Sequence, residues 1–167
     1  MKYLAALALL LLPVPADAEQ IGRWFSPRGG ATAAIVHEFD AAKDSIWVLA
    51  YTFTSRPIAD ALIRAKNRGV EIVVILDSDS VNGRGAQATR LIDAGCLVLS
   101  DAAHPIAHNK VSIIDGVLVF GGSFNYSAQA ELNAENLTLE DGREALRDFI
   151  DDFRRHRQHS IPLKVRR

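Results

Sequence analysis

The sequence predicts an α/β protein with a mixed, mostly parallel sheet that is flanked by helices. Three observations support this prediction. Between residues 31 and 99, segments typical of helices alternate with segments typical of strands. Asp115-Gly116 then separates two short apolar runs, which is a strong signal of an antiparallel hairpin. Near the C-terminus, apolar residues recur with the period of a helix that packs one face on a sheet.

Residues 1–18 have the pattern of a secretory signal peptide. Lys2 provides a positive start, residues 4–12 are an unbroken apolar run, and Ala16-Asp17-Ala18 offers small residues where a signal peptidase cleaves. The apolar run is too short to cross the roughly 30 Å of a bilayer's hydrocarbon core. We therefore expect cleavage after Ala18, a periplasmic or secreted protein, and a single domain over residues 19–167.

The first half of the expected domain alternates helices and strands. Ile35, Val36 and Phe39 recur at intervals typical of the buried face of a helix. The strand segments are nearly continuous apolar runs, as in strands buried on both faces. Pro57 suits the start of a helix and Gly69 suits its end. The expected elements are a loop over 24–30, a helix over 31–43, a strand over 45–53, a helix over 57–69, a strand over 70–76, a helix that ends near residue 95 and a strand over 96–99.

The second half begins with the hairpin. Leu146, Phe149, Ile150 and Phe153 have the spacing of one helix face, so a closing helix is expected to pack on the sheet. The expected elements are hairpin strands over 111–114 and 117–120, a helix over 126–133, a short strand over 136–140 and this closing helix.

Polar residues gather at the open end of the expected hairpin. A two-residue turn pairs Ile114 with Val117, which places His108 opposite Ser123 and Lys110 opposite Gly121. Opposed residues share a face of a sheet, as do residues two apart along one strand. Gly121 and Gly122 would leave this face open, and Asp115 would have a structural role in the turn. The register therefore predicts four polar side chains on one face: His108, Lys110, Ser123 and Asn125.

These residue types suit the cleavage of a phosphodiester bond. A lysine neutralises phosphate oxygens, serine and asparagine can donate hydrogen bonds, and histidine can transfer a proton or act as a nucleophile. A covalent route needs a nucleophile and an acid at the same moment, and His108 can serve as only one of them. The other histidines lack a lysine two residues on: His37, His104, His156 and His159. The site is therefore expected to contain His108 from each of two chains, in a homodimer.

The spacing His108-x-Lys110-x4-Asp115, followed by Gly121-Gly122-Ser123-x-Asn125, resembles the HKD motif of the phospholipase D superfamily. The sequence is most similar to the small, single-motif bacterial endonuclease branch, whose members are secreted and dimeric. The similarity extends over nearly the whole expected domain. Further matching segments are residues 24–30, 50–55, 65–70 and 133–136.

The resemblance implies a phospholipase D/nuclease-like sandwich and a mechanism. His108 of one chain would attack phosphorus to form a phosphohistidine, and His108 of the other would protonate the leaving oxygen and then activate water. Lys110 and Asn125 would bind the phosphate oxygens. Ser123 and Glu135 would orient the histidines. In this family the reaction requires no metal and no cofactor.

The expected function is therefore a metal-independent endonuclease that acts on DNA or RNA. One alternative is a phospholipase D that hydrolyses phosphatidylcholine-type lipids, and a second is a non-catalytic nucleic-acid-binding dimer. The lack of a long apolar insertion disfavours the lipid substrate, and the intact motif disfavours a non-catalytic role. A net charge of −1 confines any nucleic-acid binding to a local patch. The C-terminal basic residues are either a solvated helix end or a wall of the binding groove.

Two further polar groups are expected to be structural. Asp77 and Asp79 follow a strand, where acids commonly cap loops and helices, and no third ligand accompanies them in the sequence. His104 precedes Pro105 in a loop, so it is also expected to have a structural role.

Overall fold

The computed structural model describes residues 19–164, so the expected signal peptide lies outside the described residues. The described chain forms one eight-stranded sheet with the strand order β1-β7-β6-β5-β2-β3-β4-β8. The strands are β1 (Glu19–Phe25), β2 (Ser45–Ala50), β3 (Glu71–Asp77), β4 (Leu97–Asp101), β5 (Lys110–Ile114), β6 (Leu118–Gly122), β7 (Asn136–Asp141) and β8 (Ile161–Pro162). The helices are α1 (Ala31–Ala41), α2 (Arg56–Asn67), α3 (Ala88–Asp93), the single 3-10 turn η1 (Gln129–Glu131) and α4 (Arg143–His159).

The predicted α/β class with a mixed sheet is confirmed, but the expectation of a mostly parallel sheet is wrong. Only the β2–β3 and β3–β4 pairs are parallel among the described strands. The other neighbouring pairs are antiparallel, and among them β5 and β6 form the hairpin. The sheet therefore has a parallel part around β3 and an antiparallel part from β5 to β1.

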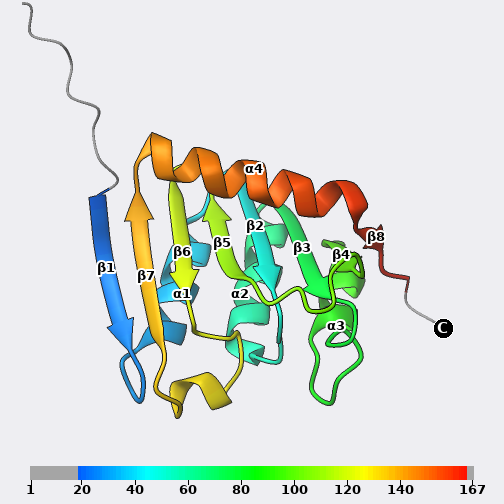
Figure 1. Ribbon diagram of the computed structural model, residues 1–167, viewed down its shortest axis with the longest axis horizontal. Helices are drawn as coiled ribbons and strands as arrows, with labels where there is room; N and C mark the ends of the chain where they lie inside the picture. Colours follow the sequence, from blue (N-terminus) through cyan, green and yellow to red (C-terminus); the bar gives the residue numbers. More distant parts are fainter. Residues whose placement is uncertain (1–18, 165–167) are drawn as a thin grey trace, which may run out of the picture.

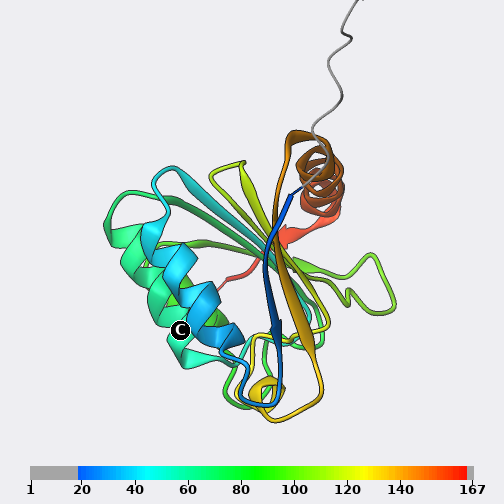
Figure 2. The same ribbon diagram turned by 90° about the vertical axis from the view of Figure 1, so that its left-hand side faces the viewer.

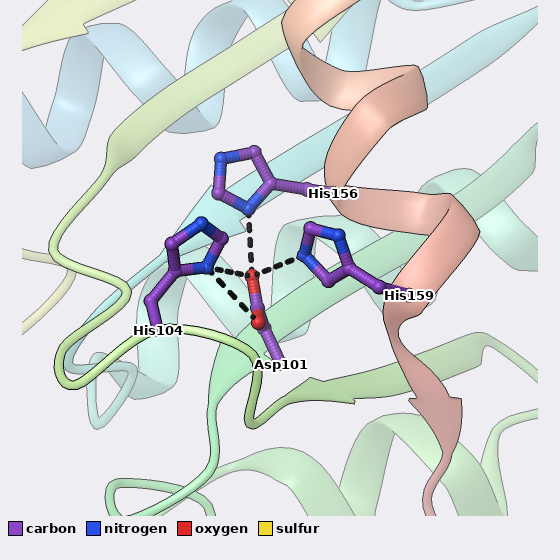
Figure 3. Close-up of side chains that lie close together, drawn as sticks. All are labelled: Asp101, His104, His156 and His159. Carbon is purple, nitrogen blue, oxygen red and sulfur yellow. Dashed lines mark hydrogen bonds and ion pairs between the residues drawn. The ribbon is translucent and has the colours of Figure 1, made fainter.

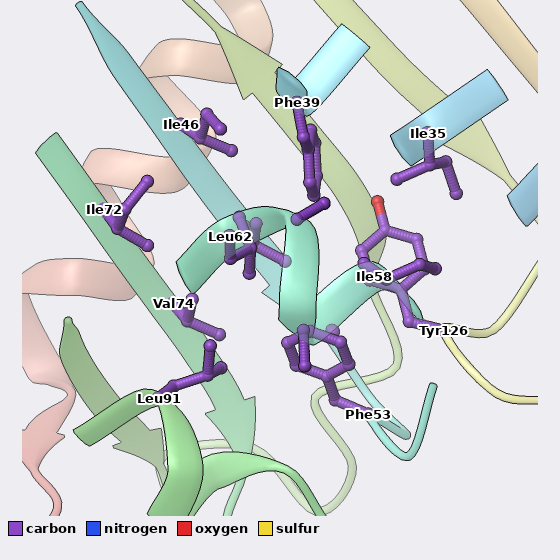
Figure 4. Packing of buried hydrophobic residues seen from close by; sticks show 14 of the residues in the cluster. Ile35, Phe39, Ile46, Phe53, Ile58, Leu62, Ile72, Val74, Leu91 and Tyr126 are labelled. Atoms are coloured by element: carbon purple, nitrogen blue, oxygen red, sulfur yellow. The ribbon is translucent and has the colours of Figure 1, made fainter. Parts of the chain in front are cut away.

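Helices cover both faces of the sheet. Helices α1 to α3 lie on one face and α4 crosses the other (Figures 1 and 2). The larger core lies on the side of α1 and α2 and contains Phe39, Leu62 and Tyr126 (Figure 4). A smaller core lies under α4, where Leu146 and Phe153 pack against the opposite face of the sheet. Burial on both faces explains why the central strands are almost continuous apolar runs.

Several expected elements differ from the structure. Residues 24 and 25 belong to β1, not to a loop, because this strand pairs with β7 from the other end of the chain. The expected helix over 126–133 is reduced to η1. Tyr126 is drawn into the core instead, where its hydroxyl shares a hydrogen bond with Ser112. Neither β1 nor the two-residue strand β8 has a strong local signal, because each depends on a partner strand far away in the sequence.

The hairpin register expected from the sequence is wrong by one residue. Asp115 and Gly116 both have a positive φ, at 52° and 64°, and the Val117 amide donates to the Ile114 carbonyl at 3.0 Å. The prediction of a turn at Asp115-Gly116 is therefore confirmed. Val117, however, belongs to the loop, and Ile114 pairs with Leu118. Continuing this register places Gly122, not Gly121, opposite Lys110.

Asp115 connects this turn to the segment between α1 and β2. Its carboxylate accepts hydrogen bonds from the backbone amides of Lys43, Asp44 and Ser45, at 3.0, 2.8 and 2.9 Å. Burial alone would raise the pKa of Asp115, but these hydrogen bonds hold it below its ordinary value. The charged Asp115 carboxylate thus anchors the hairpin turn to the start of β2.

We expect Asp115→Asn to lower the free energy of unfolding by about 2 kcal/mol at neutral pH, because the amide cannot accept all three hydrogen bonds. The pKa of Asp115 is lowered in the folded protein, so its stabilisation is complete above the ordinary carboxyl pKa. It is lost as the pH falls through the lower, folded-state pKa. Urea unfolding of both proteins from neutral to acid pH measures this.

Asp151 is a matched control, because it is exposed and pairs with Arg154 on the surface of α4. Asp151→Asn should change stability by less than about 0.5 kcal/mol. Equal stability of wild type and Asp115→Asn at neutral pH would contradict the assignment of Asp115 as an anchor.

Candidate active site

The polar residues of the motif gather at one edge of the sheet, where β2 and β6 end and β5 begins (lower edge in Figure 1). Ala50 at the end of β2 pairs with Lys110 at the start of β5. One residue further, the Tyr51 amide donates to the Asn109 carbonyl at 3.0 Å. The parallel and antiparallel parts of the sheet therefore meet at this edge, and β5 fixes where Lys110 lies.

Lys110 is only 6% exposed although it carries an ammonium group. Its Nζ donates to the His108 carbonyl at 2.8 Å and lies 5.4 Å from the centre of the Tyr51 ring. Burial lowers the pKa of Lys110, and the charge of Glu135 acts in the opposite direction. A buried cation beside one carboxylate and an aromatic face is suited to bind an anion at the open side of the site.

His108 is exposed beside this lysine, and the centroid of its ring lies 4.7 Å from the centroid of the Tyr51 ring. The residues on both sides of it are anchored. The Ala107 amide donates to the buried Asp77 carboxylate at 2.9 Å, and the Asn109 side chain lies 3.5 Å from Asp152. The backbone at His108 is therefore held while its imidazole faces solvent.

Asp77 also accepts hydrogen bonds from the backbone amides of Asp79 and Ser80. These contacts are those of an acid that organises loops, as the sequence led us to expect.

Ser123 and Glu135 lie together on the other side of the site. The Ser123 hydroxyl donates to Glu135 at 2.5 Å, and the Asn133 side chain donates to the second carboxylate oxygen at 3.0 Å. The Ser123 oxygen also accepts from the Asn136 amide at 3.1 Å. The hydrogen bonds from Ser123 and Asn133 lower the pKa of Glu135, and Lys110 adds to this effect against the influence of burial. Glu135 is thus a fixed negative charge near Lys110.

Gly122 makes this arrangement possible. Its φ of 141° lies outside the range of ordinary strand residues, and a Cβ here would come within 2.4 Å of the Asn136 carbonyl. The chain leaves the strand at this point, and the amides of Ser123 and Phe124 both donate to that carbonyl. Ser123 and Asn125 therefore follow a turn, and simple strand alternation does not determine where they point.

The structure corrects the role expected for Gly121. A Cβ at Gly121 would face Phe149 of α4 at 4.0 Å, on the opposite side of the sheet from Lys110. Gly121 does not open the face that Lys110 occupies. Asn125 is half-buried, and its Oδ1 is buried without a hydrogen-bond partner among the described residues. Such an amide is available for a further partner, with either its oxygen or its nitrogen after a flip.

The sequence interpretation missed the contacts of three residues. Tyr51 packs against both His108 and Lys110, Asn133 helps to hold Glu135, and Asp77 anchors the residue before His108. Tyr51 and Asn133 belong to segments that matched the family pattern, so a weak signal existed. No local signal joins Asp77 to a loop 30 residues away.

The arrangement contains an exposed imidazole, a buried ammonium group, an asparagine amide and a serine–glutamate pair, all at one end of a mixed sheet in an α/β fold. This combination defines a hydrolase suited to phosphate esters. Residues 35–157 match the family described as "Cardiolipin synthase, PLD-like domain". The chain belongs to the phospholipase D superfamily and is a phosphodiesterase.

Individual relatives agree with this membership. A protein named phospholipase D from Rickettsia felis is 35% identical over 135 residues, which cover 80% of this chain and 68% of that protein. The crystal structure of Nuc from Salmonella typhimurium, a phospholipase D family member, is 29% identical with a TM-score of 0.83 and covers 89% of this chain and 100% of its own. NucT from Helicobacter pylori shares the fold at 23% identity and a TM-score of 0.79, over 88% of this chain and 100% of that one.

The electrostatic interaction between Lys110 and Glu135 can be tested directly. Glu135→Gln should lower the pKa of Lys110 further, because it removes the charge that opposes the effect of burial. NMR titration of selectively ¹³C-labelled lysine side chains measures this pKa.

Glu38→Gln on α1 serves as the control and should leave the Lys110 titration unchanged. An unchanged or raised Lys110 pKa in Glu135→Gln would show that the two groups do not interact as the structure indicates.

Proposed function

We propose that this phosphodiesterase is a metal-independent endonuclease that cleaves DNA or RNA in a site shared by two copies of the chain. The observation that carries the proposal is that the site holds one histidine. The sequence contains five histidines. His37 lies on α1. His104, His156 and His159 surround the Asp101 carboxylate in a separate cluster. A second histidine for the reaction must therefore come from another chain.

The reaction then proceeds in two balanced steps. In the first, His108 of one chain attacks phosphorus, a P–N bond forms, and the P–O bond to the leaving oxygen breaks while His108 of the other chain gives that oxygen its proton. In the second, the other histidine takes a proton from water, whose oxygen attacks phosphorus and breaks the P–N bond. Lys110 and Asn125 stabilise the charge on the non-bridging oxygens, and Ser123 and Glu135 orient the imidazoles.

Exposed apolar side chains beside the site support the presence of a second copy. Phe25 and Leu132 are 64% and 65% exposed. Phe25 pairs with Asn136 next to Glu135, and Leu132 directly follows the turn η1. Large exposed apolar residues next to an incomplete site are suited to a surface that a partner covers.

The open position of the site favours a nucleic acid as substrate. His108 and Ser123 are both exposed at the sheet edge, so a phosphate in the middle of a long polymer can reach them. Contacts to phosphate oxygens carry no sequence information, which accounts for cleavage with little sequence preference. The sequence pattern of residues 1–18 supports action in the periplasm or outside the cell.

The second candidate is a phospholipase D, because the Rickettsia felis relative carries that name. The chemistry at phosphorus would be the same, with a lipid head group as the leaving alcohol. None of the helices in the described part of the chain has the length and apolar character needed to span a bilayer. Substrate trials must therefore decide between the two candidates.

We expect the mature protein to cleave plasmid DNA or single-stranded RNA in EDTA and to leave phosphatidylcholine vesicles intact. Gel electrophoresis and measurement of released choline compare the substrates. Choline release without nucleic-acid cleavage would replace the nuclease by the phospholipase. Binding of nucleic acid without any cleavage would favour a non-catalytic dimer.

His108→Ala should reduce cleavage by on the order of 10⁴-fold or more, because it removes the nucleophile and the acid together. Mixing tests the shared site. If wild type is refolded with an equal amount of His108→Ala, mixed dimers contain only one His108 and are inactive, so activity per wild-type chain falls to about half.

The matched control is His37→Ala, whose side chain is 80% exposed on α1. It should retain full activity alone and in the mixture. Unchanged activity per wild-type chain in the His108→Ala mixture would show that each chain works alone.

A further inference from the structure

A second cluster of polar side chains lies away from the candidate active site. Asp101 ends β4, His104 lies in the loop that follows, and His156 and His159 belong to the last turns of α4 (Figure 3). All three imidazoles point toward the Asp101 carboxylate. Two pairs with the same spacing, Asp101-x-x-His104 and His156-x-x-His159, thus meet from distant parts of the chain. On α4 this spacing places both histidines on one face.

The four ligand atoms converge closely. One nitrogen of each histidine and one oxygen of Asp101 all lie within 4.8 Å of one another. From Asp101 Oδ2, the distances are 2.6 Å to His156 Nδ1, 3.1 Å to His159 Nε2 and 3.2 Å to His104 Nδ1. His104 Nδ1 also lies 3.2 Å from Oδ1, so three imidazoles share the two oxygens of one carboxylate. A cation between the groups would instead receive one lone pair from each.

The Asp101 carboxylate is suited to bind a cation. Asp101 is fully buried, with an exposed fraction of 0%. Its two oxygens are contacted by the three imidazoles and by the Ala103 amide. A buried carboxylate needs positive charge beside it, which a bound metal ion would supply.

We propose that Asp101, His104, His156 and His159 bind one Zn²⁺ or a similar divalent transition-metal ion. Imidazole and carboxylate are ligands that zinc prefers, and four protein ligands complete its tetrahedral shell. A site with no open position is structural, so it differs from the metal-independent chemistry proposed for His108. Tetrahedral ligands about 2.0 Å from zinc lie about 3.3 Å apart, so the His156–Asp101 contact must lengthen slightly when the ion binds.

A carboxylate behind one ligand supports this site. Asp152 Oδ2 lies 3.7 Å from His156 Nε2, the nitrogen that points away from Asp101. Carboxylates in this position commonly orient the histidines that bind metals. The same oxygen of Asp152 is contacted by the Asn109 side chain, one residue after His108.

The proposed ion would join three separate segments. It would connect the end of α4 to the end of β4 and to the loop over residues 102–109, which contains His108. Asp101, Ala107, Asn109 and His156 already line one small void together. The ion would therefore stiffen the backbone that presents His108, without contacting the substrate.

Metal content and affinity test this proposal. The mature protein is treated with EDTA, dialysed into metal-free buffer and titrated with ZnCl₂ by calorimetry, and bound zinc is counted by mass spectrometry. We expect one zinc per chain and a rise in Tm of about 5–10 °C at a free zinc concentration one hundred times Kd. Co²⁺ in place of zinc should show the intense visible absorption of a tetrahedral site.

His104→Ala and His159→Ala should each weaken zinc binding by about tenfold or more. Both side chains are exposed, so neither substitution removes a core contact. His37→Ala is the matched control, because it keeps the cluster and should bind zinc as the wild type does.

Binding of less than one zinc per chain by the wild type, or equal affinity in all three variants, would overturn the metal site and leave a hydrogen-bonded cluster. These readouts do not depend on cleavage. Failure of the proposed nuclease activity would leave the zinc result intact, and the reverse also holds.

Discussion

The pairing of β5 with β2 is the contact on which the rest of the structure depends. It joins the parallel strands β2, β3 and β4 to the antiparallel strands β6, β7 and β1, and it places Lys110 beside the end of β2. Asp115 secures one end of β5 through three backbone amides. The hydrogen bond from Tyr51 to Asn109 secures the other end. The active-site edge is where these two halves of the sheet meet.

The candidate site combines a buried ammonium group with an exposed imidazole. Lys110 is buried and its charge is balanced by Glu135, while His108 stands in solvent on an anchored backbone. Such preorganisation lowers the cost of arranging charges when the phosphate reacts. Among the described residues His108 is the one histidine at this edge, which is the observation behind the proposal of a site shared by two chains.

The loop before His108 connects the two polar centres of the molecule. Asp77 holds its end at Ala107, and the Asp101 cluster holds its beginning at Ala103 and His104. Helix α4 contacts this loop at two points. His156 binds Asp101 at the start of the loop, and Asp152 accepts a hydrogen bond from the Asn109 side chain at its end. A helix that covers the sheet thus also contributes to the position of the active-site backbone.

Much of the fold could be predicted from the sequence, because it rests on local patterns. Apolar patterns predicted the central strands and the helices α1, α2 and α4, and Asp115-Gly116 predicted the hairpin. The spacing of the motif predicted four site residues: His108, Lys110, Ser123 and Asn125. The strand β1 and the shortened turn η1 could not be predicted in this way, because each is stabilised by partners distant in the sequence.

The sequence by itself therefore determined the class of the fold, the family and the chemical groups of the site. Only the tertiary structure decided the hairpin register, which the loop position of Val117 shifts by one residue, and the path after Gly122 that brings Ser123 to Glu135. It alone also brought His156 and His159 to Asp101, more than fifty residues away in the sequence. The physical reason is that periodicity encodes which face of an element is buried, whereas a long-range contact depends on how those faces pack together.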